Sequence, residues 1–156
     1  MIEPTAELVA SIASRIEALL LALDEDLAVS GQSPATLAEF ERRDPSQRVG
    51  SRALIKTVEQ LEDQLARMFR TLLQMLDVDT SGWFAQDIAN QMEKLEVVAD
   101  AGQWMTVVKL RNRLVHDYPI DQEARFVKLV EAYGAVDILR DCAFRTQSFI
   151  KLRKMI

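Results

Sequence analysis

Residues 54–76, LIKTVEQLEDQLARMFRTLLQML, hold the most regular apolar pattern in the sequence. Apolar side chains recur there at alternating steps of four and three: Leu54, Val58, Leu61, Leu65, Met68, Leu72 and Met75. This spacing puts them on one face of an α-helix. A narrow, unbroken face of this kind packs against antiparallel neighbours at a shallow angle, as in four-helix bundles. The stretch therefore predicts one long helix of a helical bundle.

Further helices are expected on both sides of this stretch, because other segments repeat apolar residues at the same steps. Their expected starts, in chain order, are Pro4–Thr5, Thr80 or Ser81 as an N-cap, Gln103, and Asp121 as an N-cap. Their expected ends, in the same order, are Gly31–Pro34, Asp100–Gly102 and the turn before Pro119. The alternating pattern of β-strands is nearly absent, so the fold class predicted is all-α.

The connection from Val29 to Ser51 is long for a helical bundle, where loops usually have about two to eight residues. Residues 34–43 are compatible with a short helix. Asp44–Ser46 are expected to interrupt the helical structure, and Gly50 to interrupt it more weakly. A flap or a partner surface would both fit. The overall prediction is an antiparallel four-helix up-and-down bundle with an additional short helix, in one domain covering residues 1–156.

Charge and cysteine content restrict the function classes. The chain has 156 residues and a net charge of −5, so bulk binding of nucleic acid is disfavoured and any RNA contact must use a local basic patch. The lone cysteine, Cys142, fits a reducing cytoplasm, and its apolar surroundings favour a packed thiol over a nucleophile. The N-terminal residues MIEPTAE lack the basic start of a secretory signal, and no apolar run is long enough to cross a membrane.

Polar residues interrupt the apolar face in residues 107–123, VVKLRNRLVHDYPIDQE. Arg111 stands where the apolar face of this helix should continue, and Asn112 borders the same face. An unpaired buried charge is costly, so Arg111 is expected either to pair with an acidic residue of a neighbouring helix or to face a groove or interface. His116, the only histidine, follows Asn112 by four and Arg113 by three and therefore shares their helical face.

Residues 111–118, RNRLVHDY, carry a resemblance to a known family. The string Arg-x4-His-x-Tyr, with Asn after the Arg, resembles the hallmark of the HEPN superfamily and of its HepT-like toxins. A Pro-Ile-Asp turn into another helix follows, as in many such proteins. The resemblance covers roughly the second half of the chain, and residues 83–104 are similar in layout, whereas the N-terminal helix and residues 29–51 are not specific to the family.

The resemblance implies a metal-independent endoribonuclease, the toxin of a HepT/MntA-type pair, that needs no cofactor. Arg111 and His116 would be catalytic, in a composite site at a homodimer interface, and Asn112 and Arg113 would bind the RNA substrate. Tyr118 would accept AMP from the cognate partner, a minimal nucleotidyltransferase antitoxin.

Two other interpretations stay open. HEPN relatives also act as non-catalytic partners of minimal nucleotidyltransferases, in which Arg111, Asn112 and His116 would bind a nucleotide or another phosphate group. The acidic composition mildly favours that interpretation. In the third, the chain is a structural bundle whose Arg111 and His116 are satisfied within the core. With the full string in view, the ribonuclease interpretation is favoured over the other two.

Overall fold

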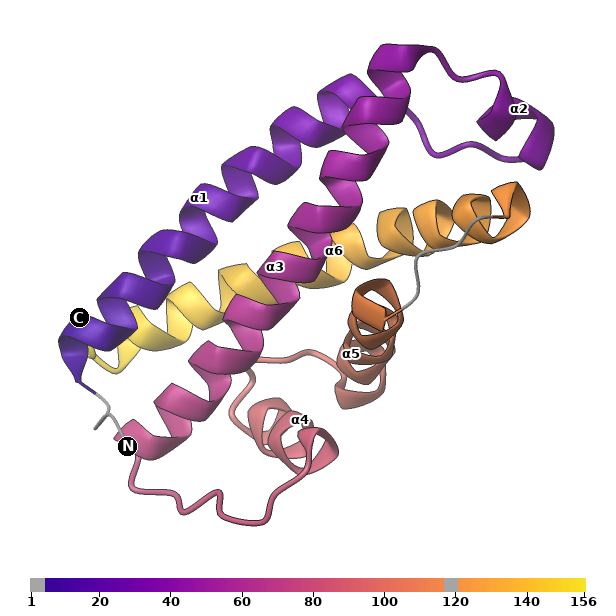
Figure 1. The fold of residues 1–156 in the computed structure, drawn as a ribbon. Coiled ribbons are helices and arrows are strands. Elements are labelled where there is room, and N and C mark those ends of the chain that lie inside the picture. Colours follow the sequence, from indigo (N-terminus) through magenta and orange to yellow (C-terminus); the bar gives the residue numbers. More distant parts are fainter. Residues whose placement is uncertain (1–4, 117–120) are drawn as a thin grey trace.

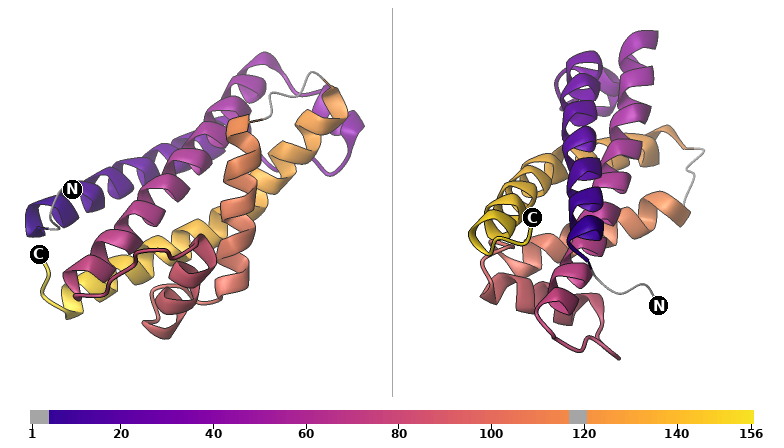
Figure 2. Two further views of the ribbon diagram at one scale, coloured as in Figure 1. Left: turned by 60° about the horizontal axis from the view of Figure 1, so that its bottom comes forward. Right: turned by 90° about the vertical axis from the view of Figure 1, so that its left-hand side faces the viewer.

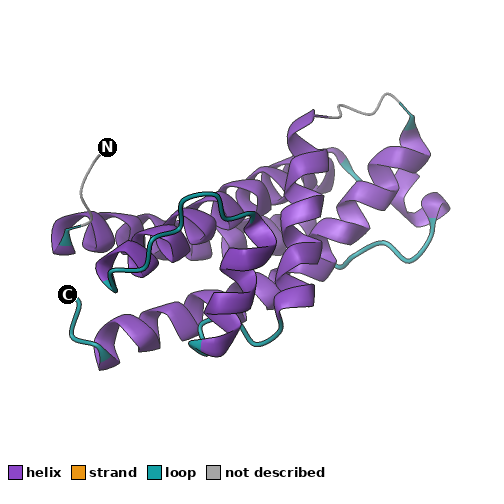
Figure 3. Ribbon diagram, turned by 90° about the horizontal axis from the view of Figure 1, so that it is seen from below, coloured by secondary structure: helices purple, strands orange, loops and turns teal. Residues whose placement is uncertain are grey.

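In the computed structural model, residues 5–116 and 121–156 are described, with the side chain of His116 left out. Across these residues every regular element is an α-helix, so the all-α prediction is confirmed (Figure 3). The helices are α1 (Ala6–Ser30), α2 (Leu37–Glu41), α3 (Pro45–Met75), α4 (Ala85–Lys94), α5 (Ala101–His116) and α6 (Gln122–Leu152). The described residues contain two short helices, α2 and α4, where one was expected.

The two helices α1 and α3 lie side by side and run in opposite directions, and α6 crosses both (Figure 1). Asp44 and Gln47 form a capping box at the start of α3, with Pro45 in its first turn. The expected break at Asp44–Ser46 is therefore a helix start. Gly50 is helical, which corrects the prediction of a break there. A Cβ on Gly50 would lie 2.6 Å from the backbone nitrogen of Ser30, so glycine permits the close contact of α1 and α3.

The connection predicted to be a flap or partner surface is tied to the rest of the fold. Arg43 is buried, and its guanidinium donates to Ser30 Oγ at 2.7 Å and to the carbonyl of Gln32 at 3.2 Å. Tyr133 of α6 donates to the carbonyl of Gly31 at 2.6 Å. The ring of Phe40 in α2 lies 5.8 Å from that of Phe126 in α6. These contacts anchor α2 beside the start of α6 (Figure 2).

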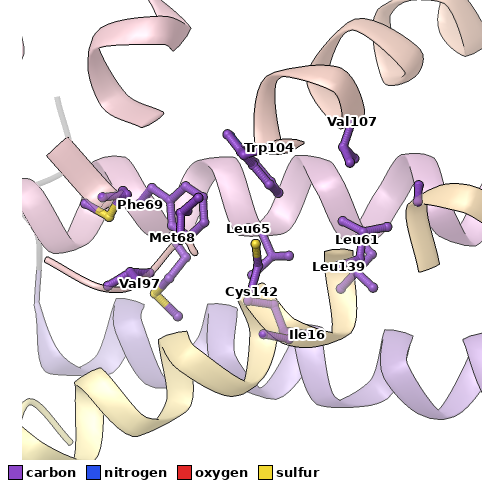
Figure 4. Packing of buried hydrophobic residues seen from close by; sticks show 14 of the residues in the cluster. Ile16, Leu61, Leu65, Met68, Phe69, Val97, Trp104, Val107, Leu139 and Cys142 are labelled. Carbon is purple, nitrogen blue, oxygen red and sulfur yellow. The ribbon is translucent and has the colours of Figure 1, made fainter. Parts of the chain in front are cut away.

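The core forms where the apolar faces of α1, α3, α5 and α6 meet. All the residues of the predicted face from Leu54 to Leu72 are fully buried, which confirms that part of the pattern. Trp104 of α5 points toward α3 and packs edge-on against Phe69, with ring centroids 4.9 Å apart (Figure 4). Trp104 is thus a packing residue, and it fixes α5 against α3.

The segment around α4 differs most from its prediction. Neither Thr80 nor Ser81 caps the helix: Phe84 is the N-cap, and Asp87 accepts its backbone N–H at 2.8 Å. The helix ends at Lys94 instead of near Asp100. Phe84 is 79% exposed because it stands at the N-cap, outside the helical repeat.

The helices α5 and α6 begin close to their predicted starts. Asp100 accepts the backbone N–H of Gln103 at 2.9 Å, and Asp121 accepts that of Glu123 at 3.1 Å. Because Trp104 lies against Phe69 and Arg111 lies against Glu62, α5 runs antiparallel to α3. In the described part of the chain, no helix has the length and apolar character needed to cross a membrane.

Candidate functional site

Arg111 lies between α5 and α3, where two acidic side chains meet it. Its Nε is 3.4 Å from Glu62 Oε2, and its Nη2 donates to Asp63 Oδ1 at 3.1 Å. The Arg111 side chain is 31% exposed, while that of Glu62 is 5% exposed. The expectation of an acidic partner on a neighbouring helix is therefore confirmed. The guanidinium is fixed on its inner side and reaches solvent on its outer side.

Burial changes the protonation of Glu62. Removal from water raises its pKa from 4.5 to about 7, the Arg111 charge opposes this rise, and the Asp63 charge adds to it. Glu62 follows Val58 by four and precedes Leu65 by three, so it is an acid on the apolar face of α3. A charge bordering this apolar face was the sequence signal for its role, and the sequence interpretation missed it.

Asn112 and Arg113 turn to different surroundings. Asn112 is exposed, and its Oδ1 accepts from Arg111 Nη1 at 3.5 Å, so the structure brings these two predicted site residues together. Arg113 forms an ion pair with Glu131 of α6. The Glu131 carboxylate therefore partly neutralises the Arg113 guanidinium. The Arg113 side chain points toward α6, whereas that of Arg111 points toward α3.

His116 is the last residue of α5. Helix continuity to this position puts residues 112 and 116 one turn apart on one face of α5. The predicted AMP acceptor, Tyr118, lies outside the described residues. The predicted end of this helix before Pro119 lies at the edge of the described residues and stays a prediction.

A second feature lies beside the end of α5. The cationic pocket, of about 580 Å³, opens between α2, the start of α3, the last turn of α5 and the start of α6. Its basic lining residues are Arg48, Arg52, Lys56, Arg125 and Lys128. The sequence analysis required a local basic patch for any nucleic-acid contact, and this pocket is one. The sequence analysis did not recognise this patch, because Arg48, Arg52 and Lys56 belong to α3 whereas Arg125 and Lys128 belong to α6.

A reactive thiol and a metal centre are two other kinds of site that the side chains of a protein can form. Cys142 is buried, and burial raises the pKa of its thiol to about 12, which keeps the thiol protonated at neutral pH and fits the predicted packing role. Within residues 5–116 and 121–156, no group of three or more His, Cys, Asp or Glu side chains is placed to hold a metal ion.

Replacement of Glu62 by glutamine is expected to stabilise the protein above pH 7. A carboxyl whose pKa is higher in the folded than in the unfolded state stabilises the fold below the unfolded pKa. That contribution is lost as the pH rises to the folded pKa. The wild type should therefore lose up to about 3 kcal/mol between pH 4.5 and pH 7, and Glu62→Gln should not. Melting temperatures across this range measure the difference.

Glu17→Gln is the matched control, because it makes the same substitution at an exposed position of α1, away from Arg111 and Glu62. Its melting curve should follow the wild type at every pH. A Glu62→Gln effect of equal size at pH 4 and pH 8 would contradict the raised pKa of Glu62.

Comparison of the chain with protein-family models, curated proteins and solved structures finds no match. The resemblance to the HEPN superfamily therefore rests on the residue string and its place at the end of α5.

Proposed function

We propose that the protein is a metal-independent endoribonuclease, the toxin of a toxin–antitoxin pair, with Arg111 and His116 as its catalytic residues. The observation that carries the proposal is the position of Arg111. Glu62 and Asp63 hold its guanidinium from one side, yet 31% of the side chain is exposed on the helix that ends at His116. A fixed but accessible guanidinium is suited to bind a phosphate with paired hydrogen bonds.

The reaction proposed is attack of the ribose 2′-hydroxyl on the neighbouring phosphate. The new O–P bond forms as the bond to the 5′-oxygen breaks, leaving a 2′,3′-cyclic phosphate and a 5′-hydroxyl. A base must take the proton of the 2′-hydroxyl, and an acid must give a proton to the leaving oxygen. Arg111 would stabilise the negative charge that develops on the phosphorane oxygens, and Asn112 would orient the phosphate or ribose.

A homodimer supplies the second proton-transfer group. One histidine cannot easily act as base and acid in the same step, and the chain has one. A two-fold axis beside α5 would bring His116 of the partner subunit to the same phosphate, so the two imidazoles divide the roles. Arg113 would contact the strand farther from the scissile bond, with part of its charge used by Glu131.

Regulation by a minimal nucleotidyltransferase is part of the proposal. In the cytoplasm, transfer of AMP to Tyr118 would place a bulky negative group next to His116 and exclude RNA by repulsion and bulk.

The two carboxylates at Arg111 favour one second candidate, a non-catalytic partner that binds a nucleotide or another phosphate group. Glu62 and Asp63 reduce the positive potential at Arg111 and therefore its power to stabilise a transition state. Binding a phosphate requires a weaker positive potential than stabilising the extra negative charge of a transition state.

Expression of the protein without its partner separates the two candidates. The ribonuclease should arrest growth within a few generations of induction, because RNA is cut throughout the cell. Arg111→Ala and His116→Ala should both abolish the arrest at equal protein levels. Lys109→Ala, an exposed position on the same helix, is the matched control and should still arrest growth. Normal growth with abundant, folded, dimeric wild-type protein would favour the binding partner instead.

A further inference from the structure

On its α3 side, the cationic pocket carries positive charge that the described residues compensate only in part. On α3, Arg48, Arg52 and Lys56 repeat every four residues, a spacing at which like charges repel. Among the described residues that line the pocket, Glu59 is the one acid, and it pairs with Lys56 at 3.2 Å.

The individual cations differ in how much of their bonding capacity is used. Arg48 donates to the carbonyl of Arg43 at 3.3 Å, and Lys128 donates to that of Arg113 at 3.4 Å. Arg48 retains further N–H donors. Arg52 is exposed and makes no hydrogen bond or ion pair with the described residues. The pocket therefore suits an anion with more than one negative charge, bound through guanidinium and ammonium groups.

The rest of the lining is apolar. Ile55, Leu114 and Leu129 line the pocket, and so does Phe40 of α2. A site for a bare inorganic anion would not need such walls. The volume of about 580 Å³ lies within the range of roughly 300–1,000 Å³ typical of sites for small organic ligands. The ligand should therefore combine a multiply charged group with a flat or apolar body.

We propose that the cationic pocket binds a nucleotide, with its phosphates on Arg48 and Arg52 and its base against Phe40 and Leu114. A fatty acid has a single charge and would leave most of the cations unmatched. The nucleotide can be free or can be one residue of a single strand, since both present the same chemistry. This site is separate from Arg111, which does not line the pocket, and nucleotide binding requires no cleavage.

Calorimetric titration of the full-length protein tests this site with ATP, adenosine and inorganic triphosphate as separate ligands. ATP should bind at least about 10-fold more tightly than either fragment, because only ATP meets both the cations and the apolar wall. Arg52→Glu should weaken ATP binding by about 10–100-fold, the effect of losing a charge-assisted bond. Its melting temperature should hold or rise, since the substitution removes repulsion from Arg48 and Lys56.

Arg70→Glu is the matched control, an exposed charge reversal on α3 away from the pocket, and it should bind ATP like the wild type. Absence of ATP binding, equal binding of ATP and triphosphate, or equal effects of the two reversals would overturn the proposal. Competition with a 5′-phosphorylated single-stranded tetraribonucleotide shows whether the natural ligand is a free nucleotide or part of a strand. If the tetraribonucleotide displaces bound ATP at a lower concentration than ATP itself does, the ligand is a strand. If it competes more weakly than ATP, the ligand is a free nucleotide. Protein that binds ATP but cuts no RNA would support the pocket and contradict the proposed ribonuclease.

Discussion

His116→Ala should lower the rate of RNA cleavage by about 10²–10⁴-fold, the usual contribution of a positioned proton-transfer group. The loss should be in the maximal rate, with little change in RNA affinity, because an imidazole contributes mainly when the proton moves. Folding should be unaffected, because alanine is a good helix former and His116 lies in the last described turn of α5. Single-turnover cleavage of a labelled single-stranded RNA measures the effect.

Lys109→Ala is again the matched control for this experiment, because it removes an exposed cation from α5 without touching the Arg111 cluster. It should cleave at the wild-type rate, apart from a modest salt-dependent loss of affinity. Equal rates for His116→Ala and the wild type would remove His116 from the mechanism.

Arg111→Ala should damage catalysis and stability together, and pH separates the two effects. Loss of the guanidinium should lower cleavage by roughly 10²–10³-fold, the range seen when one preorganised transition-state donor is removed. Below pH 7 Glu62 is mostly protonated, so its loss of a partner should matter little. Above pH 7 the ionised Glu62 would be buried without Arg111, and the cost should grow by up to about 1.4 kcal/mol per pH unit.

Two further variants assign these effects to their causes. Arg111→Lys should recover stability better than activity, because an ammonium offers charge without the planar pair of donors. Adding Glu62→Gln to Arg111→Ala should restore the melting temperature at pH 8 and leave cleavage impaired. Full recovery of cleavage by this double variant would show that Arg111 acts only by holding the fold.

The fold was predictable where one local rule dominates. The face from Leu54 to Leu72 specified its helix because its spacing is unbroken, and Asp121 specified the start of α6 because it caps it. The prediction for the start of α3 was wrong. Asp44 and Pro45 were interpreted as a break between helices, although an N-cap Asp and a Pro in the first turn both favour a helix start. The need for glycine at position 50 could not be predicted from the sequence, because it comes from the close approach of the Ser30 backbone on another helix.

The candidate site was predictable in part for the same reason. Arg111 was found because a charge interrupts an apolar face, and the same test applied to Glu62 would have found its partner. The choice of Glu62 and Asp63 over other acids depends on how α5 lies against α3, which the sequence pattern leaves open. The cationic pocket joins Arg52 of α3 to Arg125 of α6, and only the folded chain brings such distant residues to one cavity.

The most direct test of the ribonuclease proposal is cleavage by the purified wild-type dimer in EDTA, using one RNA and the same strand with 2′-deoxyribose throughout. The proposed mechanism predicts that the RNA is cut to fragments ending in a 2′,3′-cyclic phosphate and beginning with a 5′-hydroxyl. The deoxy strand, which lacks the attacking 2′-hydroxyl, should stay intact. An uncut RNA with folded, dimeric protein, or equal cutting of both strands, would contradict the proposal.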